Sequence, residues 1–498
     1  MVIIIVEVFS NLLLEQEIYR EGTSMMKKTK IICTMGPNTD NKDLLRKLME
    51  NGMDIARLNF SHGDYEEQGN RIKLIKELRE ELGKPIAILL DTKGPEIRVR
   101  NMKDGKALIE EGKKVTLTTR DVIGDETLIP ITYEQLPEDV RKGNRILIDD
   151  GLMELMVLNV QETEIECMVV SGGYVASKKG INVPNVRVNL PAITEKDKED
   201  IRFGIENGID FIAASFVRNA DAIREIREIV NECNANVSII AKIENEEGVC
   251  NVDSIIEAAD GIMVARGDLG VEIPPEEVPF IQKRIINKCN HAFKPVITAT
   301  QMLDSMMRNP RPTRAEVTDI ANAIYDGTDA IMLSGETAVG KHPIEALKMM
   351  VGVAKATEMH LDYGLLLKEG QENKHKGISN AVSFSAVTTA DNVNAKLILT
   401  STYSGGTARL ISMYRPEAQI VGLSPNENIL RKMQILWGVH PLYVKEADST
   451  DEILQNAVDV VKENNMVSAK DIVVVTGGGP ASKNTAGVTN MIKVVEVI

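Results

Sequence analysis

Short apolar runs alternate with amphipathic segments along most of the chain. Segments such as 41–51 and 221–232 carry apolar residues three and four positions apart, as on one face of a helix. Eight apolar runs of strand length lie between them, and each ends in small, polar or charged residues: KIICTMGP, DIARLNFSHG, IAILLDTKGPEIR, FIAASFV, SIIAKIEN, GIMVARGDLG, VITATQM and AIMLSGETA. Eight strand-helix units that close on themselves predict an α/β protein with a TIM (β/α)8 barrel.

One stretch interrupts the alternation. Between Glu96 and about Val188 the pattern changes to short alternating strands with glycine-rich turns, as in KVTLTTRD, NRILIDDGLMEL and EIECMVVSGG. The stretch follows the third predicted strand, at the barrel end where active sites lie. We therefore expect an inserted all-β domain that closes over the substrate as a lid. A structural decoration far from the chemistry is the alternative interpretation.

The sequence becomes polar after His360 and then returns to β/α alternation in KLILTSTYSGG, AQIVGLSP and DIVVVTGGGP. We interpret 361–376 as a linker and 377–498 as a separate C-terminal α/β domain. Two turns rich in Gly, Ser and Thr follow strands there, at 402–407 and 476–479. Backbone amides at such a turn can bind phosphate, and a tight turn without a ligand fits the same residues.

These changes of pattern give the domain boundaries. The barrel takes 26–95 and 189–360, and the inserted β-barrel domain takes 96–188. Residues 1–25 stand apart, because their apolar run is interrupted by Glu7, Ser10 and Asn11 and no basic residue precedes it. The run is therefore neither a convincing signal peptide nor a membrane span. Either translation begins at Met25 or Met26, or the segment packs on another element or subunit.

Composition narrows the possible partners. The 498 residues are 43% hydrophobic and 26% charged, which is typical of a globular protein large enough for two or three domains. The net charge of −15 argues against a nucleic-acid or membrane surface, since both require a dominant positive field. The five cysteines are scattered and lack metal-ligand spacing, which favours reduced thiols in a cytoplasm.

The segment 237–270 carries the most suggestive charges. Lys242 and Glu244 follow one predicted strand, and Arg266 and Asp268 follow the next. Because the C-terminal ends of parallel barrel strands share one rim, the four side chains can converge there. Two carboxylates suit a divalent cation, and the basic side chains would hold an anion against it. Either fragment alone is typical of a rim salt bridge, but together they indicate a phosphoryl-transfer site.

The motifs DIARLNFSHG, LLDTKGPEIR, AKIEN, GIMVARGDLGVEIP, ATQML and AIMLSGETA closely resemble, in this order and spacing, those of the pyruvate kinase family. The resemblance covers essentially everything from Lys28 onward, including the inserted and C-terminal domains. It implies the last step of glycolysis, in which phosphate moves from phosphoenolpyruvate to ADP, giving ATP, and the enolate is then protonated to pyruvate.

The resemblance also assigns roles at the rim. Glu244 and Asp268 would ligate Mg²⁺ or Mn²⁺, and Lys242 would stabilise charge on the phosphoryl oxygens in the transition state. Arg57 would grip the substrate phosphate. Preorganised groups of this kind already point to where charge develops.

Further residues would handle the rest of the substrate and the proton. By resemblance, the turn at Gly267 and Asp268, with Thr300, would hold the carboxylate end of the substrate. Thr300 and Ser334 end the seventh and eighth predicted strands, where a hydroxyl can relay a proton to the enolate carbon through water. Which of the two hydroxyls acts, or whether water suffices, stays open.

The nucleotide would contact three basic side chains. By resemblance these are His62, Arg98 and Lys179, with Lys179 reaching in from the lid. For Lys179 the alternative is a solvated pair with its neighbouring lysine.

A second, monovalent cation is also expected by resemblance. The family's K⁺ ligands correspond to four residues at the ends of the second and third strands: Asn59, Ser61, Asp91 and Thr92. One carboxylate among neutral oxygens suits a large singly charged ion better than Mg²⁺. Mutual hydrogen bonding at the rim is the alternative. In the family a glutamate at the position of Glu96 accompanies K⁺ dependence, whereas a lysine there makes the ion dispensable.

The C-terminal domain resembles the regulatory domain of the family. Its turn at 402–407 is similar to a cradle for a phosphorylated effector, a sugar phosphate or AMP, with candidate contacts at Thr402, Ser404, Gly405 and Thr407. The loop 477–490 lacks the Trp and Arg that some members place around the effector, so the effector's identity is open. A homotetramer is implied. Some bacterial relatives carry an extra C-terminal domain, which we do not expect here.

Two other functions fit parts of the same pattern. A metal-dependent aldolase of the phosphoenolpyruvate/pyruvate type also binds Mg²⁺ with Glu and Asp at strand ends, but it would not need Lys242, Arg98 or the lid. A non-catalytic phosphometabolite sensor would use the C-terminal domain for binding. Because every matched catalytic position holds the family residue, the sensor is disfavoured.

Overall fold

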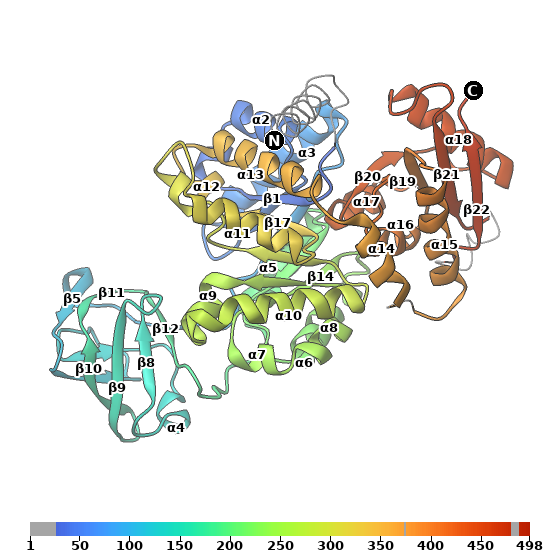
Figure 1. Ribbon diagram of the computed structural model, residues 1–498. Coiled ribbons are helices and arrows are strands. Elements are labelled where there is room, and N and C mark those ends of the chain that lie inside the picture. The colour runs from blue at the N-terminus through green and yellow to red at the C-terminus, as the bar shows by residue number, and fades with distance from the viewer. Residues whose placement is uncertain (1–25, 373–374, 480–487) are drawn as a thin grey trace, which may run out of the picture.

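The computed structural model describes residues 26–372, 375–479 and 488–498. Its centre is a closed barrel of eight parallel strands in the order β1-β17-β16-β15-β14-β13-β3-β2, which confirms the predicted TIM barrel (Figure 1). All eight predicted runs form strands, because their Ile, Val, Leu and Met side chains are buried on both faces of the sheet. The strands are β1 (Lys30–Thr34), β2 (Ile55–Asn59), β3 (Ala87–Asp91), β13 (Phe211–Ala214), β14 (Ser238–Ile243), β15 (Gly261–Ala265), β16 (Val296–Ala299) and β17 (Ala330–Leu333).

Helices surround this barrel, and several begin at capping side chains. Asn41 and Asp64 each accept a backbone N–H at the start of α2 and α3, and Thr194 and Thr313 form capping boxes at α5 and α11. The predicted helices at 41–51 and 221–232 correspond to α2 and α6. The helices are α2 (Lys42–Glu50), α3 (Tyr65–Leu82), α5 (Glu195–Glu206), α6 (Ala220–Glu232), α7 (Glu246–Cys250), α8 (Val252–Ala258), α9 (Arg266–Glu272), α10 (Val278–His291), α11 (Arg314–Tyr325), α12 (Gly335–Ala338) and α13 (Pro343–Glu358).

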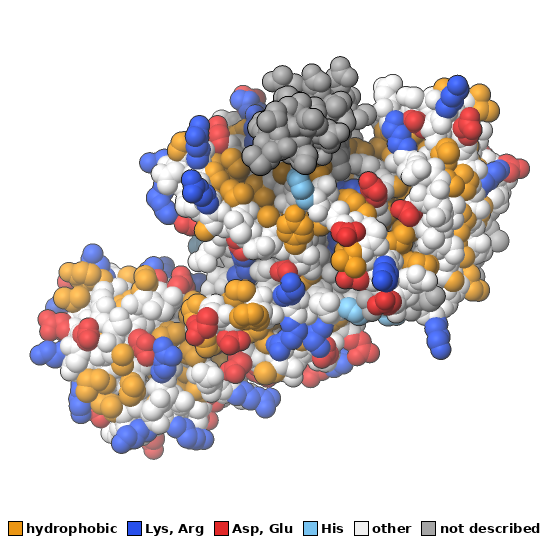
Figure 2. Space-filling view, viewed as in Figure 1, with side chains coloured by type: hydrophobic (Ala, Val, Ile, Leu, Met, Phe, Trp, Pro, Cys, Tyr) orange, Lys and Arg blue, Asp and Glu red, His pale blue; other side chains and the backbone are white. Residues whose placement is uncertain are grey.

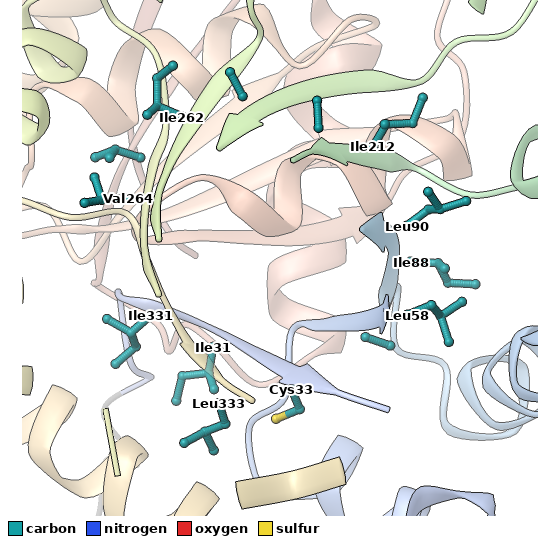
Figure 3. Packing of buried hydrophobic residues seen from close by; sticks show 14 of the residues in the cluster. Ile31, Cys33, Leu58, Ile88, Leu90, Ile212, Ile262, Val264, Ile331 and Leu333 are labelled. Atoms are coloured by element: carbon teal, nitrogen blue, oxygen red, sulfur yellow. The ribbon is translucent and has the colours of Figure 1, made fainter. Parts of the chain in front are cut away.

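The barrel strands separate two apolar layers. Alternate side chains such as Ile31 and Cys33 point outward and pack against the surrounding helices, as Figure 3 shows for these and other labelled residues. The residues between them, such as Ile32, fill the barrel interior with Leu89, Phe211 and other buried side chains. This alternation follows from the two-residue repeat of a strand.

Four aspartates close the N-terminal end of the barrel. They precede β2, β13, β15 and β17, and each accepts a backbone N–H near the start of the preceding barrel strand, at 2.7 to 2.9 Å: Asp54 from Ile31, Asp210 from Ile88, Asp260 from Ile239 and Asp329 from Val296. Each also forms an ion pair, with Lys27, Arg431, Arg227 and Arg415 respectively. Each carboxylate thus fixes two neighbouring strands and meets a cation. We call these four residues the aspartate ring.

The inserted segment forms the predicted β domain. A seven-stranded sheet in the order β4-β12-β8-β9-β10-β6-β7 is joined by a two-stranded sheet, β11-β5, and one short helix, α4 (Leu136–Asp139). The strands are β4 (Ile97–Arg98), β5 (Lys106–Ile109), β6 (Lys114–Thr118), β7 (Leu128–Pro130), β8 (Arg145–Ile148), β9 (Met153–Val160), β10 (Glu164–Ser171), β11 (Gly173–Ala176) and β12 (Gly180–Asn182). The domain has an apolar core of its own, which includes Leu117, Ile129 and Leu155.

The C-terminal domain is a five-stranded sheet in the order β20-β19-β18-β21-β22, with β22 antiparallel to β21. Its strands are β18 (Leu397–Ser401), β19 (Gln419–Ser424), β20 (Val439–Tyr443), β21 (Ile472–Gly477) and β22 (Met491–Glu496), and its helices are α15 (Ile378–Asn392), α16 (Gly406–Met413), α17 (Glu427–Lys432) and α18 (Thr450–Glu463). The predicted linker at 361–376 contains a helix, α14 (Tyr363–Glu372). Residues 1–25, for which we expect an extension or a misassigned start, lie outside the described residues.

The inserted and C-terminal domains extend from opposite sides of the barrel (Figure 1). The C-terminal domain meets the N-terminal strand ends, where its Arg415 and Arg431 pair with two members of the aspartate ring. Lys28 also donates there, through its Nζ, to the carbonyl oxygen of Pro416 at 2.7 Å. The insertion instead follows β3, at the opposite rim. The two added domains therefore adjoin opposite ends of the barrel.

Three further features concern the surface charge, the cysteines and the hydrophobicity of the helices. On the face drawn in Figure 2, basic and acidic side chains are interspersed. All five cysteines are free, and burial raises the pKa of the Cys167 thiol to about 12. Among the helices that the structure describes, none has the length and apolar character needed to cross a membrane.

Candidate active site

Lys242 is the centre of the charged cluster at the C-terminal rim. It is the penultimate residue of β14, and its Nζ lies 3.0 Å from Asp91 Oδ1 and 2.9 Å from Glu244 Oε1. It also donates to Ser215 Oγ at 2.7 Å. Burial lowers the pKa of Lys242, but the two carboxylates raise that pKa more, so it lies above its ordinary value. The ammonium group is therefore a fixed positive charge.

Glu244 and Asp268 lie at the ends of neighbouring strands. Glu244 directly follows β14, and its Oε2 accepts the backbone N–H of Phe216 at 2.6 Å. Burial raises the pKa of Glu244 to about 7, with Lys242 acting in the opposite direction and Asp268 adding to the rise. Burial also raises the pKa of Asp268, with smaller contributions in the same direction from Asp150 and Glu96. Within the described residues the Asp268 carboxylate has no hydrogen bond or ion pair.

This pair of carboxylates fits a divalent cation. Both have raised pKa values, because burial and the neighbouring carboxylates leave the site short of positive charge. Oxygen ligands of this kind suit Mg²⁺ or Mn²⁺. No cluster of three or more His, Cys, Asp or Glu side chains able to hold a metal occurs in the part of the chain that the structure describes. An ion bound by Glu244 and Asp268 would therefore take its other ligands from water and substrate.

Arg57 reaches the same cluster from β2. Its Nε lies 2.6 Å from Asp91 Oδ2, and its Nη1 donates to Thr34 Oγ1 at 2.9 Å. Burial raises the pKa of Asp91, but Arg57 and Lys242 lower it more, so the pKa lies below its usual value. Asp91 thus stays ionised and orients both cations.

The four predicted K⁺ ligands lie side by side at the ends of β2 and β3. Asn59 and Asp91 are register partners, and Asn59 Oδ1 accepts the backbone N–H of Ser61 at 3.0 Å. The Thr92 carbonyl and hydroxyl oxygens accept hydrogen bonds from Ser215 at 2.6 and 3.1 Å. Because both Asp91 oxygens are also engaged, a monovalent ion here would have to share these oxygens with protein donors.

Thr300 directly follows β16 in an unusual backbone conformation. Its φ is 69°, in the left-handed region that β-branched residues rarely adopt. Its Oγ1 accepts the backbone N–H of Gly267 at 2.7 Å and donates to the Ala299 carbonyl at 2.6 Å. Ser334 follows β17, and its backbone N–H donates to Glu336 Oε2 at 2.7 Å. No hydrogen bond joins the side-chain hydroxyls of Thr300 and Ser334, both of which are described.

The three predicted nucleotide contacts are divided between the barrel and the insertion. His62 is exposed in the loop after β2. In the insertion, Arg98 donates to Glu96 Oε2 at 2.6 Å and to the Lys178 carbonyl at 2.7 Å, and Lys179 Nζ lies 2.8 Å from Asp149. Arg98 and Lys179 therefore lie close together near the base of the insertion. No contact joins either of them to His62, which is also among the described residues.

The expected convergence of Arg266 on the carboxylates is wrong. Its Nη1 lies 2.6 Å from Asp319 Oδ1, and its Nη2 donates to the Thr300 carbonyl at 2.8 Å. The reason is local. Helix α9 starts at Arg266 itself, and the side chain turns toward α10 and α11, where Gln282 and Asp319 accept it.

Three residues near the site escaped the sequence analysis. Ser215 joins Lys242 to Asp91 and Thr92, and Thr34 orients Arg57. The charge of Asp150, in the insertion, raises the pKa of Asp268. Ser215 and Thr34 lie at the ends of the predicted strands FIAASFV and KIICTMGP, so their positions in the sequence already indicated that they are near the rim. Asp150 could not be placed, because its approach depends on how the inserted domain sits on the barrel.

The candidate effector turn is compact. Thr402 Oγ1 accepts the backbone N–H of Gly405 at 3.0 Å, and Ser404 Oγ accepts that of Gly406 at 3.4 Å. Gly405, with φ of 80°, is the N-cap residue of α16. Thr407 is buried, with its hydroxyl 2.8 Å from that of Thr489. Of the second turn and its loop, 480–487 lie outside the described residues.

Comparison with known proteins agrees with this architecture. The family model described as the pyruvate kinase barrel domain matches residues 26–347, and that of the pyruvate kinase α/β domain matches 380–495. Pyruvate kinases from Staphylococcus aureus strains MRSA252 and USA300 are each 51% identical over 471 residues, which is 94% of this chain and 80% of theirs. A crystal structure of a pyruvate kinase from Cryptosporidium parvum superimposes with a TM-score of 0.91 at 40% identity, covering 95% of this chain and 97% of that one.

These matches decide between the functions that the sequence left open. They extend over the barrel and the C-terminal domain together and name one phosphotransferase activity throughout, which neither the aldolase nor the sensor interpretation accounts for. The chain belongs to the pyruvate kinase family.

Proposed function

We propose that the chain transfers the phosphoryl group of phosphoenolpyruvate to ADP at the C-terminal rim of the barrel and then protonates the enolate to pyruvate. The observation that carries this assignment to the rim is the buried Lys242 ammonium, held between Asp91 and Glu244. Pyruvate formation from phosphoenolpyruvate, followed with and without ADP, tests it. Pyruvate should form only with ADP. Phosphoenolpyruvate breakdown without ADP would contradict the proposal.

Lys242 and Arg57 stabilise the transferring group. Both cations are held in place by Asp91, so they need little reorganisation when charge shifts from the enolate oxygen to the nucleotide. Lys242 remains protonated, and its fixed charge stabilises the negative charge on the phosphoryl oxygens. Arg57, oriented also by Thr34, binds the phosphate before and during transfer.

Glu244 and Asp268 hold the divalent ion. When bound, Mg²⁺ or Mn²⁺ supplies the positive charge that neutralises substrate and phosphoryl oxygens. The two carboxylates follow the adjacent strands β14 and β15, and Asp268 raises the pKa of Glu244, so both could hold one ion. Their raised pKa values support this role, because a cation would relieve the repulsion between them.

Thr300 and Ser334 serve the other end of the substrate. The Thr300 hydroxyl and the Gly267 backbone lie within hydrogen-bonding distance of each other beside Asp268, where they can bind the substrate carboxylate. Proton delivery to the enolate carbon then passes through water held by Thr300 or Ser334. Comparing solvent hydrogen exchange into pyruvate for Thr300→Ala and Ser334→Ala would identify the hydroxyl that matters.

ADP binds between the barrel and the inserted domain, which acts as a lid. His62 contributes from the barrel, and Arg98 and Lys179 contribute from the insertion. Asn182 of the insertion already donates to Glu272 of α9 at 2.7 Å, so the two bodies touch beside the site. Closing the insertion would exclude water from the phosphoryl group, which protects it from hydrolysis.

K⁺ binds at Asn59, Ser61, Asp91 and Thr92 in this proposal. A monovalent ion offsets the carboxylate charge around Asp268 and Glu96 and helps orient the substrate phosphate. Activity should be higher in K⁺ than in Na⁺ at matched ionic strength, and Glu96→Lys should depend less on K⁺. Full activity of the unmodified protein in a bulky organic cation alone would reject the site.

The assembly and its regulation complete the proposal. We infer a cytoplasmic homotetramer whose turn at 402–407 binds a sugar phosphate or AMP and shifts the affinity for phosphoenolpyruvate. Mass measurement in solution tests the tetramer. Phosphoenolpyruvate saturation curves recorded with each candidate effector test the turn, and curves that none of them moves would leave it without a regulatory role.

A further inference from the structure

We propose that Arg266 is a positioning residue, which acts on the reaction by holding Thr300 in its left-handed conformation. The inference rests on the proposed function, in which the Thr300 hydroxyl faces the substrate. Arg266 itself touches no reacting group. Its guanidinium is turned away from the carboxylates and packs behind the turn that carries Thr300.

The contacts of Arg266 define this role. The side chain is only 10% exposed and contacts three separate elements. Nη1 pairs with Asp319 of α11 at 2.6 Å and approaches Gln282 of α10 at 3.3 Å. Nη2 donates to the Thr300 carbonyl at 2.8 Å. Arg266 therefore ties the turn after β16 to the helices outside the barrel.

The turn needs such support. Thr300 and Gln301 have φ values of 69° and 55°, so two consecutive residues with side chains lie in the left-handed region. Such a conformation persists only where its surroundings hold it, and it is found mainly at functional sites. The hydrogen bond from Arg266 to the Thr300 carbonyl is a contact that the turn would lose in the ordinary extended conformation.

Backbone groups next to Arg266 complete the arrangement. The N–H of Gly267 donates to Thr300 Oγ1, and that hydroxyl donates to the Ala299 carbonyl. Arg266 thus fixes the carbonyl of Thr300, and the backbone N–H of Gly267 fixes the hydroxyl of Thr300.

An arginine is required for this geometry. Its planar fork meets Asp319 with one nitrogen and the Thr300 carbonyl with the other. A lysine keeps the charge but has one ammonium on a flexible stem, so it cannot hold both partners in the same way. Arg266→Lys is therefore the informative variant, because it separates charge from shape.

The test is a double-mutant cycle with phosphoenolpyruvate and ADP. Arg266→Lys should lower kcat by about 10²-fold, the size of loss expected when a reacting group is displaced by about 1 Å. Thr300→Ala should also lower kcat, and adding Arg266→Lys to it should change kcat less than about twofold. An additive loss would overturn the proposal, as would a higher KM for phosphoenolpyruvate at unchanged kcat, which would mean that Arg266 binds the substrate anion.

Arg227→Lys is the matched control. Arg227 likewise pairs with an aspartate, Asp260, at 2.6 Å and approaches a backbone carbonyl, that of Val237, at 3.5 Å, but it does so at the other end of the barrel. Its kcat should stay within about twofold of the unmodified protein, even if both lysine variants lower the unfolding temperature equally. Equal losses of kcat in the two variants would overturn the proposal, because they would indicate a general structural effect.

A crystal structure of the Arg266→Lys protein gives a readout independent of activity. Thr300 should leave the left-handed region, and its hydroxyl should lose the hydrogen bond from Gly267. Retention of both features would overturn the proposal whatever the kinetics. If the unmodified protein formed no pyruvate, the proposed function would fail, while this structural outcome would still decide the role of Arg266.

Discussion

The two ends of the barrel use acidic side chains in opposite ways. At the N-terminal end each member of the aspartate ring accepts at least one backbone N–H and forms an ion pair with a basic side chain. At the C-terminal rim, among the described residues, Asp91, Glu244 and Asp268 share two basic side chains, Lys242 and Arg57. Asp150 adds negative charge, and Glu96 is paired with Arg98. Each carboxylate of the ring has a cation of its own, whereas the three rim carboxylates share two cations, and Asp268 has no ion pair among the described residues.

This difference separates structural from chemical use of the same residue type. A buried carboxylate with a fixed partner stabilises the fold only while that partner is present, so its contribution appears in unfolding. A carboxylate without a partner inside the protein costs stability and is available to a ligand. Substitutions at the N-terminal end should therefore change stability, and substitutions at the rim should change activity.

The largest expected effect is on stability at the N-terminal end. Asp329→Ala leaves the buried Arg415 without its ion-pair partner, which lies 2.9 Å away. The free energy of unfolding should fall by about 3 to 5 kcal/mol, the range for removing one partner of a buried pair. Urea denaturation measures it, with kcat per folded molecule unchanged. In Asp260→Ala the lost carboxylate is 39% exposed, so the fall should be smaller, and equal falls would contradict the burial argument.

At the rim, Lys242→Met should lower the rate of phosphoryl transfer by at least about 10²-fold, the usual loss when one preorganised charge is removed. Exchange of the pyruvate methyl protons, which depends more on the metal, should fall less. Quenched-flow kinetics and proton NMR follow the two steps. Lys27→Met, which removes the partner of Asp54 at the opposite end, should retain kcat. Near-normal transfer in Lys242→Met would remove this residue from the mechanism.

Lys30 extends the comparison to pH. Its Nζ donates to the Val439 carbonyl, and burial lowers its pKa from 10.5 to about 8. Between these pH values Lys30 is protonated in the unfolded chain and neutral in the folded one. The free energy of unfolding therefore rises with pH above about 8, and this gain is lost as the pH falls back to 8. Relative to Lys30→Met, the unmodified protein should gain up to about 1.4 kcal/mol per pH unit above pH 8. Urea unfolding between pH 7 and 9.5 tests this, and a constant difference would refute it.

The smallest effect concerns the lid. Lys179 is 43% exposed and pairs with Asp149 at 2.8 Å, so exchanging this pair for a nucleotide contact involves at most about 1 kcal/mol. Lys179→Met should raise the KM for ADP by about two- to fivefold and leave kcat unchanged. Steady-state kinetics with Lys142→Met, another exposed lysine of the insertion, as control measures this. An unchanged KM for ADP would exclude Lys179 from the nucleotide site.

Much of this architecture could be predicted from the sequence. The eight strands are short apolar runs that end abruptly in charge, so Lys242, Glu244 and Asp268 could be placed at one rim from position alone. The direction of Arg266 could not, because it depends on α9 starting at that residue and on acceptors in α10 and α11. The helix α14 was not predicted, because the polar composition of 361–376 is typical of a linker.

The sequence analysis did not identify the aspartate ring, although its four residues occupy equivalent positions in the sequence. Each member stands one residue before an apolar run, in MDIAR, IDFIA, ADGIM and TDAIM. Its partners lie far away in sequence; Arg415, for example, is in the C-terminal domain. Only the folded chain distinguishes these carboxylates, each with its own cation, from Asp268 at the rim, which has no ion pair among the described residues.

Titration with Mn²⁺, followed by electron paramagnetic resonance, tests the central contrast most directly. The unmodified protein should bind the ion at the rim. Glu244→Gln and Asp268→Asn should each weaken binding by at least about tenfold, since each removes an anionic oxygen ligand. Asp260→Asn, at the N-terminal end, should bind Mn²⁺ as the unmodified protein does. Unchanged binding in both rim variants, or an equal loss in Asp260→Asn, would contradict the account.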